Sequence, residues 1–524
     1  MNFEIRAIFC RSVTIELDRD VPYCGEPVQV LIDGKLVLED ARNVLSIQGL
    51  QPDTDYALTV RCGSEEATKQ FRTSYESVLL NVRAFGAKGD GVSNDTAALQ
   101  AAIYACPAQG TVRVPKGVYF TLPLFLKSEI TLLLDEGAVL LGDPDRNHYP
   151  ILPGMVQGTD EKSEYNFGTW EGNPLDSFAA LITGIGLHDV DIIGDGVIDG
   201  NAEAGDWWED AKVRRIAWRP NAVFIAHSQN VRMQGVTVRN SPCWTVHPYY
   251  CDHISFYNLT IWNPSDSPNT DGFDPESCRD VLLLGTKISV GDDCVAIKSG
   301  KLYMSRYHFL RTDGVEIRNC LFERGHGSVT VGSEVAGGVE NVHITRCIFD
   351  GTDRGVRIKT RRGRGDRSYL GGLVFENIRM NNVHMAMTVN MFYFCDPDGH
   401  SDYVQDQSPH PVDDRTPTIG PIVIKDVTVT GADASFVCAY GLPEQPIERI
   451  ELSNVSVEFL PEEQRTPQVP VMMDNFPKLS GRSIYLHNVK EVVLKNISIT
   501  GAADTEPELI GVESALIENL EYDA

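Results

Sequence analysis

Two pieces of sequence, QNVRMQGVTV (residues 229–238) and DHISFYNLTI (residues 252–261), decide the fold class. Each piece contains two short runs rich in Val, Ile and other apolar residues, separated by a glycine or an asparagine. Short apolar runs between such turn residues are typical of β-strands. The two pieces therefore predict pairs of strands joined by tight turns.

The first run of this pattern returns along the chain, at residues 280–283, 314–317, 341–344, 372–375, 421–424, 449–452 and 491–494. From residue 230 onwards, the first five occurrences start 23, 27, 34 and 27 residues apart. This is the period of a β-solenoid whose coils carry loop insertions. A leucine-rich repeat would need a fixed leucine framework, and a propeller would need about 40 residues per blade. We therefore predict an all-β protein, a right-handed parallel β-helix in which each coil lies about 4.8 Å above the last.

The first 76 residues do not share this pattern and predict a separate domain. Strand-like runs at residues 12–17, 27–32 and 57–61 are separated by turn residues such as Asp33-Gly34. The stretch LQPDTDY (residues 50–56), followed by FRT (residues 71–73), resembles the closing strands of a fibronectin type III sandwich. We expect a small β-sandwich over residues 1–76, acting as a spacer or as a wall near a cleft, and the β-helix over residues 77–524.

A short helix is predicted where the β-helix begins. A glycine-rich turn at residues 85–91 precedes Asn94, Asp95 and Thr96, which are good helix N-caps, and residues 97–104 are rich in alanine. The glycines do not form a phosphate-binding motif. We expect this helix to cover the open end of the strand stack, because exposed strand edges need a cover.

The composition excludes several functions. The chain has 524 residues and a formal net charge of −27. Because phosphate binding needs a basic face, we expect no nucleic-acid partner. No run of about 18 apolar residues occurs, so the sequence predicts no membrane span. Screening over roughly 8–10 Å still allows a local basic patch to bind a polyanion.

The cysteines and the first residues bear on the compartment. The 12 cysteines are scattered, without a C-x-x-C pair, and we expect buried free thiols rather than disulfides or metal ligands. The first twenty residues lack the apolar segment of a signal peptide. The expectation is a cytoplasmic protein, although a periplasmic or secreted protein whose leader had been removed would look the same.

Two motifs with carboxylates lie about one coil apart. Asp271 follows Asn269-Thr270, and Asp292 and Asp293 follow Gly291, with Asp292 21 residues after Asp271. In stacked coils the three carboxylates would crowd one face. Glycoside hydrolysis needs one protonated carboxyl group to donate to the leaving oxygen and one carboxylate to activate water or to attack the sugar. Because like charges at short range keep one carboxyl group protonated, the cluster favours a glycosidase.

Two further motifs follow at similar spacing. His326 lies between two glycines, Arg357 comes 31 residues later, and Lys359 lies two positions further. Alternate residues of a strand point to the same side, so Arg357 and Lys359 share a face. A histidine can tune a nearby carboxyl proton, and an arginine–lysine pair can hold a sugar carboxylate. Calcium binding by the aspartates is the rival interpretation, but calcium needs six to eight oxygens, and a histidine with two cations argues against it. We expect no metal and no cofactor.

Together, the four motifs resemble those of the polygalacturonase family of glycoside hydrolases, family 28, over roughly residues 80–500. The resemblance implies a right-handed parallel β-helix that hydrolyses α-1,4-galacturonosyl bonds with inversion. Inversion is typical of carboxyl groups about 6.5–9.5 Å apart. The resemblance also implies roles for single residues: Asp292 as the general acid, Asp271 and Asp293 as the groups that activate water, His326 as support for the acid, and Asn269, Arg357, Lys359 and Tyr393 as substrate contacts.

Two longer stretches, NSPCWTVHP (residues 240–248) and GSEVAGG (residues 332–338), resemble the bacterial exo-acting branch of that family, as does the front domain. An exo-acting enzyme needs a cleft with one closed end. We expect the insertions at residues 149–176, 302–312 and 396–416 to supply its walls. From residue 357 to residue 367 the chain has six basic residues and one acid. We expect Arg361 and Arg362 in this cluster to hold the carboxylate of the terminal sugar. The expected partner is a galacturonate oligosaccharide or polysaccharide, and the oligomeric state stays open.

Three alternatives remain open. A hydrolase of the same family acting on rhamnogalacturonan or another substituted pectin would have less use for Arg357 and Lys359. A pectate lyase shares the β-helix but needs calcium. A non-catalytic carbohydrate-binding solenoid would have no use for three crowded aspartates beside a histidine.

Overall fold

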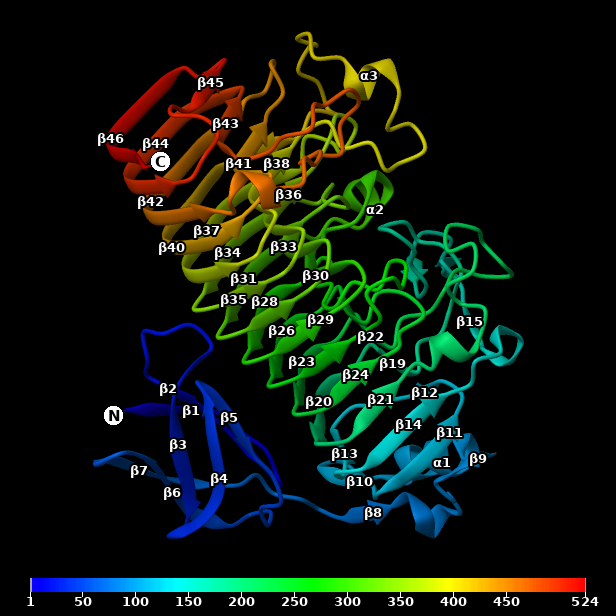
Figure 1. The fold of residues 1–524 in the computed structure, drawn as a ribbon. Coiled ribbons are helices and arrows are strands. Elements are labelled where there is room, and N and C mark those ends of the chain that lie inside the picture. Colours follow the sequence, from blue (N-terminus) through cyan, green and yellow to red (C-terminus); the bar gives the residue numbers. More distant parts are fainter. Residues whose placement is uncertain (1, 524) are drawn as a thin grey trace.

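The computed structural model describes residues 2–523, and most of them form strands stacked coil upon coil into a long column (Figure 1). Twenty-four strands belong to one parallel sheet, in which strands pair with those of the neighbouring coils. The prediction of a parallel β-helix is confirmed. The strands are β8 (Leu79–Asn81), β9 (Asp90–Asn94), β10 (Gly110–Val114), β11 (Gly117–Thr121), β13 (Ile130–Leu134), β14 (Ala138–Gly142), β20 (His188–Gly194), β21 (Val197–Asp199), β23 (Gln229–Gln234), β24 (Thr237–Arg239), β26 (Asp252–Tyr257), β27 (Thr260–Trp262), β28 (Arg279–Leu284), β29 (Lys287–Ser289), β31 (Thr312–Arg318), β32 (Leu321–Glu323), β34 (Val339–Thr345), β35 (Ile348–Asp350), β37 (Tyr369–Asn381), β39 (Thr418–Ile419), β40 (Pro421–Ala432), β42 (Ile447–Phe459), β44 (Val489–Thr500) and β46 (Ser514–Asp523).

The remaining face of the column is also parallel and consists of two blocks. The first block is β12 (Leu124–Phe125), β19 (Ile182–Ile185), β22 (Val223–Ala226) and β25 (Val246–Tyr249). The second is β30 (Asp293–Ile297), β33 (Gly327–Val331), β36 (Arg354–Lys359), β38 (Met385–Asn390), β41 (Ser435–Tyr440), β43 (Arg482–His487) and β45 (Glu508–Ile510). Phe273 joins the blocks through single bridges to Val246 and Val295. The segment around Phe273 therefore fills one coil of this face without forming a regular strand.

One corner of the column explains the asparagines that recur near the predicted turns. Its residues are in register from coil to coil and have φ between 51° and 55°: Asn319, Arg346, Asn377, Asp426, Asn454, Asn496 and Asn519. Asparagine and aspartate adopt this left-handed conformation more readily than most residues. The side chains also bond along the column, because Nδ2 of Asn496 donates to Asn454 and Nδ2 of Asn519 donates to Asn496.

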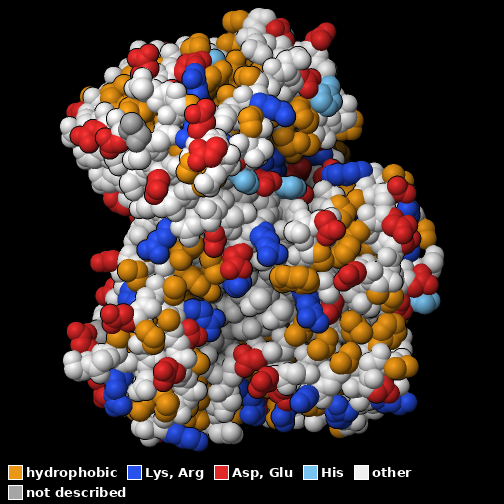
Figure 2. All heavy atoms as spheres, in the orientation of Figure 1, with side chains coloured by type: hydrophobic (Ala, Val, Ile, Leu, Met, Phe, Trp, Pro, Cys, Tyr) orange, Lys and Arg blue, Asp and Glu red, His pale blue; other side chains and the backbone are white. Residues whose placement is uncertain are grey.

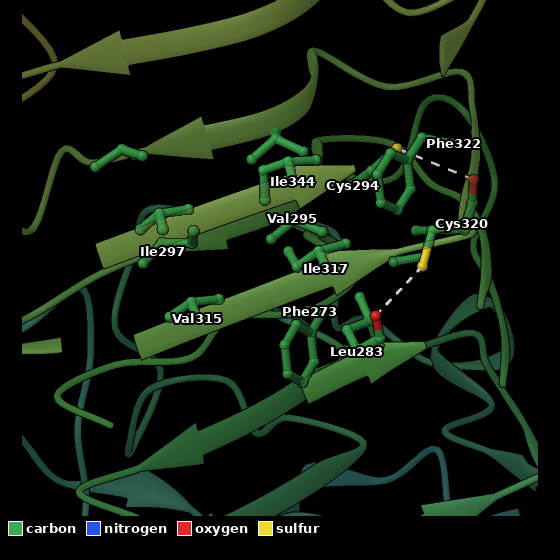
Figure 3. Packing of buried hydrophobic residues seen from close by; sticks show 14 of the residues in the cluster. Phe273, Leu283, Cys294, Val295, Ile297, Val315, Ile317, Cys320, Phe322 and Ile344 are labelled. Atoms are coloured by element: carbon green, nitrogen blue, oxygen red, sulfur yellow. Dashed lines mark hydrogen bonds between the residues drawn. The ribbon is translucent and has the colours of Figure 1, made fainter. Parts of the chain in front are cut away.

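The interior of the column is one apolar cluster to which nearly every coil contributes. Residues in register stack directly, as do Val315 and Val342, and the rings of Phe322 and Phe349 lie 5.6 Å apart. Figure 3 shows Val315, Phe322 and Phe273 among the buried side chains that point into the space between the sheets. Complete burial of such a side chain contributes about 1.5–3 kcal/mol, so the stacked core holds the faces in register.

The cysteines match the expectation of free thiols. All 12 are free, and nine of them are buried. Cys320, for example, lies inside the column, where its Sγ donates to the carbonyl oxygen of Leu283 at 3.7 Å (Figure 3). These thiols act as small apolar side chains in the core.

Helices are few. Helix α1 (Thr96–Ala105) follows Asp95 and confirms the predicted helix. Leu99, Ala102 and Ile103 of α1 pack into the core of the column, at its first coils. The other α-helices are α2 (Leu302–Tyr307) and α3 (Asp402–Gln405). None of the helices in the described part of the chain has the length and apolar character needed to cross a membrane.

The first strands form two antiparallel sheets around their own apolar core. One sheet has the order β1 (Phe3–Ile8), β2 (Val13–Leu17), β5 (Val44–Ile47), and the other β4 (Lys35–Arg42), β3 (Cys24–Ile32), β6 (Asp55–Cys62), β7 (Glu65–Arg72). The hydroxyl oxygen of Tyr56 accepts a hydrogen bond from the backbone N–H of Gln51 at 2.9 Å. The resemblance to fibronectin type III and the division at residue 76 stay predictions.

The sandwich docks on the side of the column through buried polar groups. Glu16 on β2 accepts hydrogen bonds from Arg318 and Asn319 and pairs with Arg346. Three coils earlier in the column, the side-chain oxygen of Gln234 accepts a hydrogen bond from Ser12 at 2.6 Å. The corner rich in asparagine therefore also carries the sandwich.

Candidate active site

The predicted residues meet on the face built by β30, β33 and β36. Asp293 is the first residue of β30 and is in register with Gly327, the residue after His326. The bridge between Phe273 and Val295 places Asp271 beside Asp293. One carboxylate oxygen each of Asp271, Asp292 and Asp293 lies within 4.8 Å of the other two. The three carboxyl groups therefore crowd one face, as the coil spacing predicts.

This spacing is shorter than the separation typical of inverting enzymes. Carboxyl groups in such enzymes usually lie about 6.5–9.5 Å apart, which leaves room for a water molecule. The closest oxygens of the three aspartates fall short of that range. The separation alone therefore does not support inversion.

Asp293 is held as a carboxylate by two cations. Arg357 Nη1 donates to Oδ1 and Lys359 Nζ donates to Oδ2, both at 2.9 Å. Burial opposes the charge, but Lys359 and Arg357 lower the pKa of Asp293 far below its usual range. A charged hydrogen bond on each oxygen fixes the orientation of this group.

Asp271 lies in a less favourable environment for a charge. It is 4% exposed, and its nearest cation is Lys298, with Nζ 3.5 Å from Oδ2. Burial, and next the charge of Asp292, raise the pKa of Asp271 to about 7. Near neutral pH Asp271 therefore lies between its protonated and ionised forms.

Asp292 is the accessible member of the cluster. It is half-buried, and no lysine or arginine nitrogen of the described residues forms an ion pair with it. The backbone N–H of His326 donates to the carbonyl oxygen of Asp292 at 3.0 Å. His326 Nδ1 lies 2.8 Å from Oδ2 of Asp353. This hydrogen bond raises the pKa of His326, with further help from the charges of Asp292 and Asp293, while burial opposes the shift.

A cleft of about 410 Å³ opens over these residues. Its lining includes Asp271, Asp292, Asp293, His326, Arg357 and Lys359. Acidic, basic and histidine side chains gather around a hollow in the upper half of Figure 2. Asn269 and Tyr393 line the cleft as well, and the Lys359 ammonium lies 5.3 Å from the centre of the Tyr393 ring. Eight of the ten predicted site residues therefore face one cleft.

Residues before β25 form one wall of this cleft. Arg219 donates to Asn269 Oδ1 at 2.6 Å, and the Trp170 and Trp218 rings stack 4.5 Å apart, packed against Trp244. Glu171 lines the cleft beside them and pairs with Lys212. The insertion that begins at residue 149 thus contributes to the wall on the side of the early coils.

The predicted roles of Arg361 and Arg362 do not fit their positions. Arg361 is 6% exposed and pairs with Asp396 and Asp398, while Arg362 is 1% exposed and pairs with Glu444. Neither side chain lines the cleft. The reason is that β36 ends at Lys359, so the arginines that follow turn away from the face and hold a loop.

Two expectations about the walls also need correction. Residues 302–312, which include α2, contribute nothing to the cleft lining, whereas Glu171 and Asp396 come from the other two insertions. No described residue of the sandwich lines the cleft either. The sandwich docks at the corner rich in asparagine, away from β30 and β36. It is therefore not a wall of this cleft.

Several residues of the site were not predicted as such from the sequence. Lys298, Glu334, Asp353 and Met472 are among those that line the cleft. The motif CVAIKS (residues 294–299) could have indicated Lys298. A lysine directly after an apolar strand is rarely buried unless it has a partner, so its position suggests a buried ion pair. Met472 carried no signal, since its segment reaches the cleft from more than a hundred residues beyond β36.

Comparisons with known proteins identify the family of this chain. A family model described as "Glycosyl hydrolases family 28" matches residues 158–474, and one described as "Rhamnogalacturonase A/epimerase, pectate lyase-like" matches residues 79–168. A "Probable polygalacturonase" of Vitis vinifera is 28% identical over 453 residues, which cover 85% of this chain and 84% of that protein.

An "Exo-poly-alpha-D-galacturonosidase" of Dickeya chrysanthemi is 25% identical over 457 residues, which cover 76% of this chain and 71% of that protein. Among solved structures, the family 28 exopolygalacturonase of Yersinia enterocolitica matches with a TM-score of 0.72 at 18% identity, over 98% of each chain. That likeness concerns the fold. Because the family 28 model matches more than half of the sequence, the chain belongs to family 28 of the glycosyl hydrolases.

Proposed function

We propose that this protein is an exo-acting polygalacturonase that hydrolyses α-1,4-galacturonosyl bonds of galacturonides with inversion. The observation that carries the proposal is the cluster of Asp271, Asp292 and Asp293 beside Arg357 and Lys359 in one cleft. Three carboxyl groups supply the acid and the base of glycoside hydrolysis. Two cations beside them suit a substrate whose sugars each carry a carboxylate.

The environments of the aspartates suggest how the work is divided. Asp292 is accessible, lies next to His326 and is the proton donor to the leaving oxygen. Asp293 is held ionised and, with Asp271, activates the water that attacks the sugar. Arg357 Nη1 donates to Asp293 and Nη2 donates to Met472 Sδ at 3.2 Å, which leaves the remaining guanidinium N–H groups for a galacturonate carboxylate. Inversion rests on the family resemblance, because the carboxyl separation does not favour it.

The wall on the side of the early coils supports the exo mode. Glu171, Lys212 and Trp244 line the cleft there, and we infer that they stop a long chain from continuing past the early coils. A cleft closed in this way accepts only a chain terminus. The relatives do not decide this point, because an "Endo-polygalacturonase" of Pectobacterium parmentieri is 31% identical over 317 residues, which cover 57% of this chain and 73% of that protein.

Product analysis tests the proposal. Incubation with polygalacturonate and with trigalacturonate, followed by anion-exchange chromatography, should release mono- or digalacturonate from the start, with little fall in viscosity. A ladder of intermediate oligomers would overturn the exo mode. No product from either substrate, but cleavage of rhamnogalacturonan, would favour the substituted-pectin alternative, and a product absorbing at about 235 nm only with calcium would indicate a lyase.

Asp292→Asn tests the proton donor. We expect kcat to fall by about a thousandfold, since general acid catalysis contributes about 10²–10⁴-fold. Binding of trigalacturonate, measured by calorimetry, should persist, because the amide keeps the shape of the side chain. Equal loss of binding and turnover would contradict the role. Chelation with EDTA should leave the wild-type rate unchanged.

A further inference from the structure

The floor of the cleft holds a buried lysine that these roles do not use. Lys298 follows β30 and is 3% exposed. Its Nζ lies 3.5 Å from Asp271, 3.6 Å from Asp274 and 3.2 Å from Glu334. It also lies 4.2 Å from the ring centre of Trp244. One cation therefore faces three carboxyl groups and an aromatic ring in a place that excludes most water.

Two of these carboxyl groups have a clear protonation state: Glu334 is ionised and Asp274 is neutral. Burial opposes the charge of Glu334, but Lys298, Lys301 and Arg364 lower its pKa, so it stays ionised. Asp274 is fully buried, and burial together with Asp271 raises its pKa well above its usual range, so it stays neutral. Asp271, whose pKa lies near 7, is thus the neighbour whose charge responds to Lys298 around neutral pH.

We propose that Lys298 is a positioning residue of the catalytic centre: its charge favours the ionised form of Asp271, in which that carboxylate can activate water. This inference rests on the proposed function, in which Asp292 donates the proton to the leaving oxygen and Asp271 helps to activate the water. A proton on Asp271 would block a water-activating group. Lys298 opposes this arrangement from beneath the cleft without contacting the scissile bond.

The other charged groups around Asp271 cannot replace Lys298. Asp292 and Asp293 oppose the ionisation of Asp271, and Lys359 on β36 favours it. Lys359, however, already donates to Asp293 at 2.9 Å. Two thiols also face Asp271, those of Cys243 and Cys294, and burial raises the pKa of each, so both stay neutral.

The test is the pH dependence of trigalacturonate hydrolysis by the full chain. Lys298→Met keeps an apolar stem of similar length and removes the charge. The acid limb of the kcat profile should move to higher pH by about one to three units, because a cation at this distance lowers a carboxyl pKa by that amount. The value of kcat at the wild-type optimum should fall at least about tenfold, and KM should change little. Lys298→Arg should restore the wild-type profile.

A second variant predicts the opposite sign. Glu334→Gln removes a negative charge near Asp271 and frees Lys298 to interact with it, so the acid limb should move to lower pH. This variant keeps the inference testable where Lys298→Met folds poorly. Lys287→Met is the matched control, because Lys287 pairs with Glu323 on the outer side of a neighbouring strand, and its profile should equal that of the wild type.

Several results would overturn the inference. A raised KM with an unmoved acid limb in Lys298→Met would mean that Lys298 holds the substrate, and an unmoved limb in Glu334→Gln would exclude electrostatic coupling to Asp271. No hydrolysis by the wild type would instead contradict the proposed function. In that case thermal unfolding decides. The Tm deficit of Lys298→Met should widen between about pH 5 and about pH 8, as the buried carboxyl groups ionise without a cation, and a deficit independent of pH would overturn the role.

Discussion

At the scale of single residues, environment rather than residue type separates the three aspartates. Asp293 has two cations on its oxygens, Asp271 has one cation below it and little water, and Asp292 is half-buried and unpaired among the described residues. Each step along this series changes which protonation state is favoured. Acid and base functions can therefore coexist within 4.8 Å.

Asp353 offers a test of the histidine. Because its hydrogen bond raises the pKa of His326, the protonated imidazole persists to higher pH than usual and is lost as pH rises through that pKa. In Asp353→Asn the charge is gone, so the alkaline limb of the kcat profile should move to lower pH. We expect kcat to fall by about tenfold, as for other partners that orient a catalytic histidine.

The control for Asp353→Asn lies three residues earlier. Asp350 ends β35 and faces the outer side of the column, so Asp350→Asn should leave the profile unchanged. A lower kcat in Asp353→Asn without any shift of the alkaline limb would mean that Asp353 only supports the turn before β36. That role is possible structurally, since its backbone N–H donates to the carbonyl oxygen of Gly325 at 2.9 Å.

At the scale of elements, the loop that carries Asp396 depends on arginines that do not touch the cleft. Arg362 donates to Glu444 through Nε at 2.6 Å and Nη2 at 2.9 Å, and also to the carbonyl oxygens of Tyr403 and Asp406. Arg361 holds Asp396 directly. We expected Arg361 and Arg362 to form a wall that binds substrate. They instead support, from inside, the loop that supplies Asp396 to the wall of the cleft.

Arg362→Ala measures this support. Removing one partner of a buried pair typically costs about 3–5 kcal/mol, so we expect a lower Tm and faster proteolysis within residues 396–416. Arg415→Ala is the matched control in the same loop, since its pair with Asp413 is exposed to solvent and contributes little to stability. A higher KM with an unchanged Tm in Arg362→Ala would restore the role in substrate binding.

The same contrast shows which elements could be predicted from the sequence. Coils repeat, so apolar runs such as residues 280–283 and 314–317 predicted the stacking of their strands, and stacking alone brought Asp271 to Asp293. Motif residues on β30 and β36 were placed well because a strand fixes the direction of its side chains. The register of strands within a regular face can be predicted because it depends on sequence repeats that lie close together in the chain.

Segments that leave the strands could not be placed in this way. Whether Arg361 turns toward the cleft depends on Asp396 and Asp398, which lie 35 or more residues further on. The same holds for α2, whose residues were expected in a wall and pack elsewhere. Contacts between distant loops have no periodic signature in the sequence, and for that reason the walls were predicted less well than the floor.

At the scale of the whole molecule, the sandwich and the column are joined by one buried charged group. Glu16 is 2% exposed and meets Arg318, Asn319 and Arg346 from the asparagine-rich corner, together with Arg6 of its own sheet. Such a group commits the sandwich to one docking position, because a shifted contact would leave buried cations without a partner. The cleft lies on another face, so docking and catalysis are separable.

Glu16→Gln should loosen the sandwich without affecting the chemistry. The loss of the buried charge leaves Arg346 without its anionic partner and Arg318 with Glu316 alone. Breaking a buried pair typically costs about 3–5 kcal/mol, so the linker between β7 and β8 should be cleaved faster in limited proteolysis while kcat on trigalacturonate stays unchanged. Burial opposes the charge of Glu16, but Arg318 lowers its pKa. The stability gained from a lowered pKa is present above the usual range of a glutamate and is lost as pH falls through the folded-state value. Wild-type docking should therefore weaken at acidic pH, whereas the variant should lack that pH dependence. Glu66→Gln, which breaks an exposed pair with Arg61, is the control, and equal proteolysis rates for both variants would show that Glu16 does not hold the domains together.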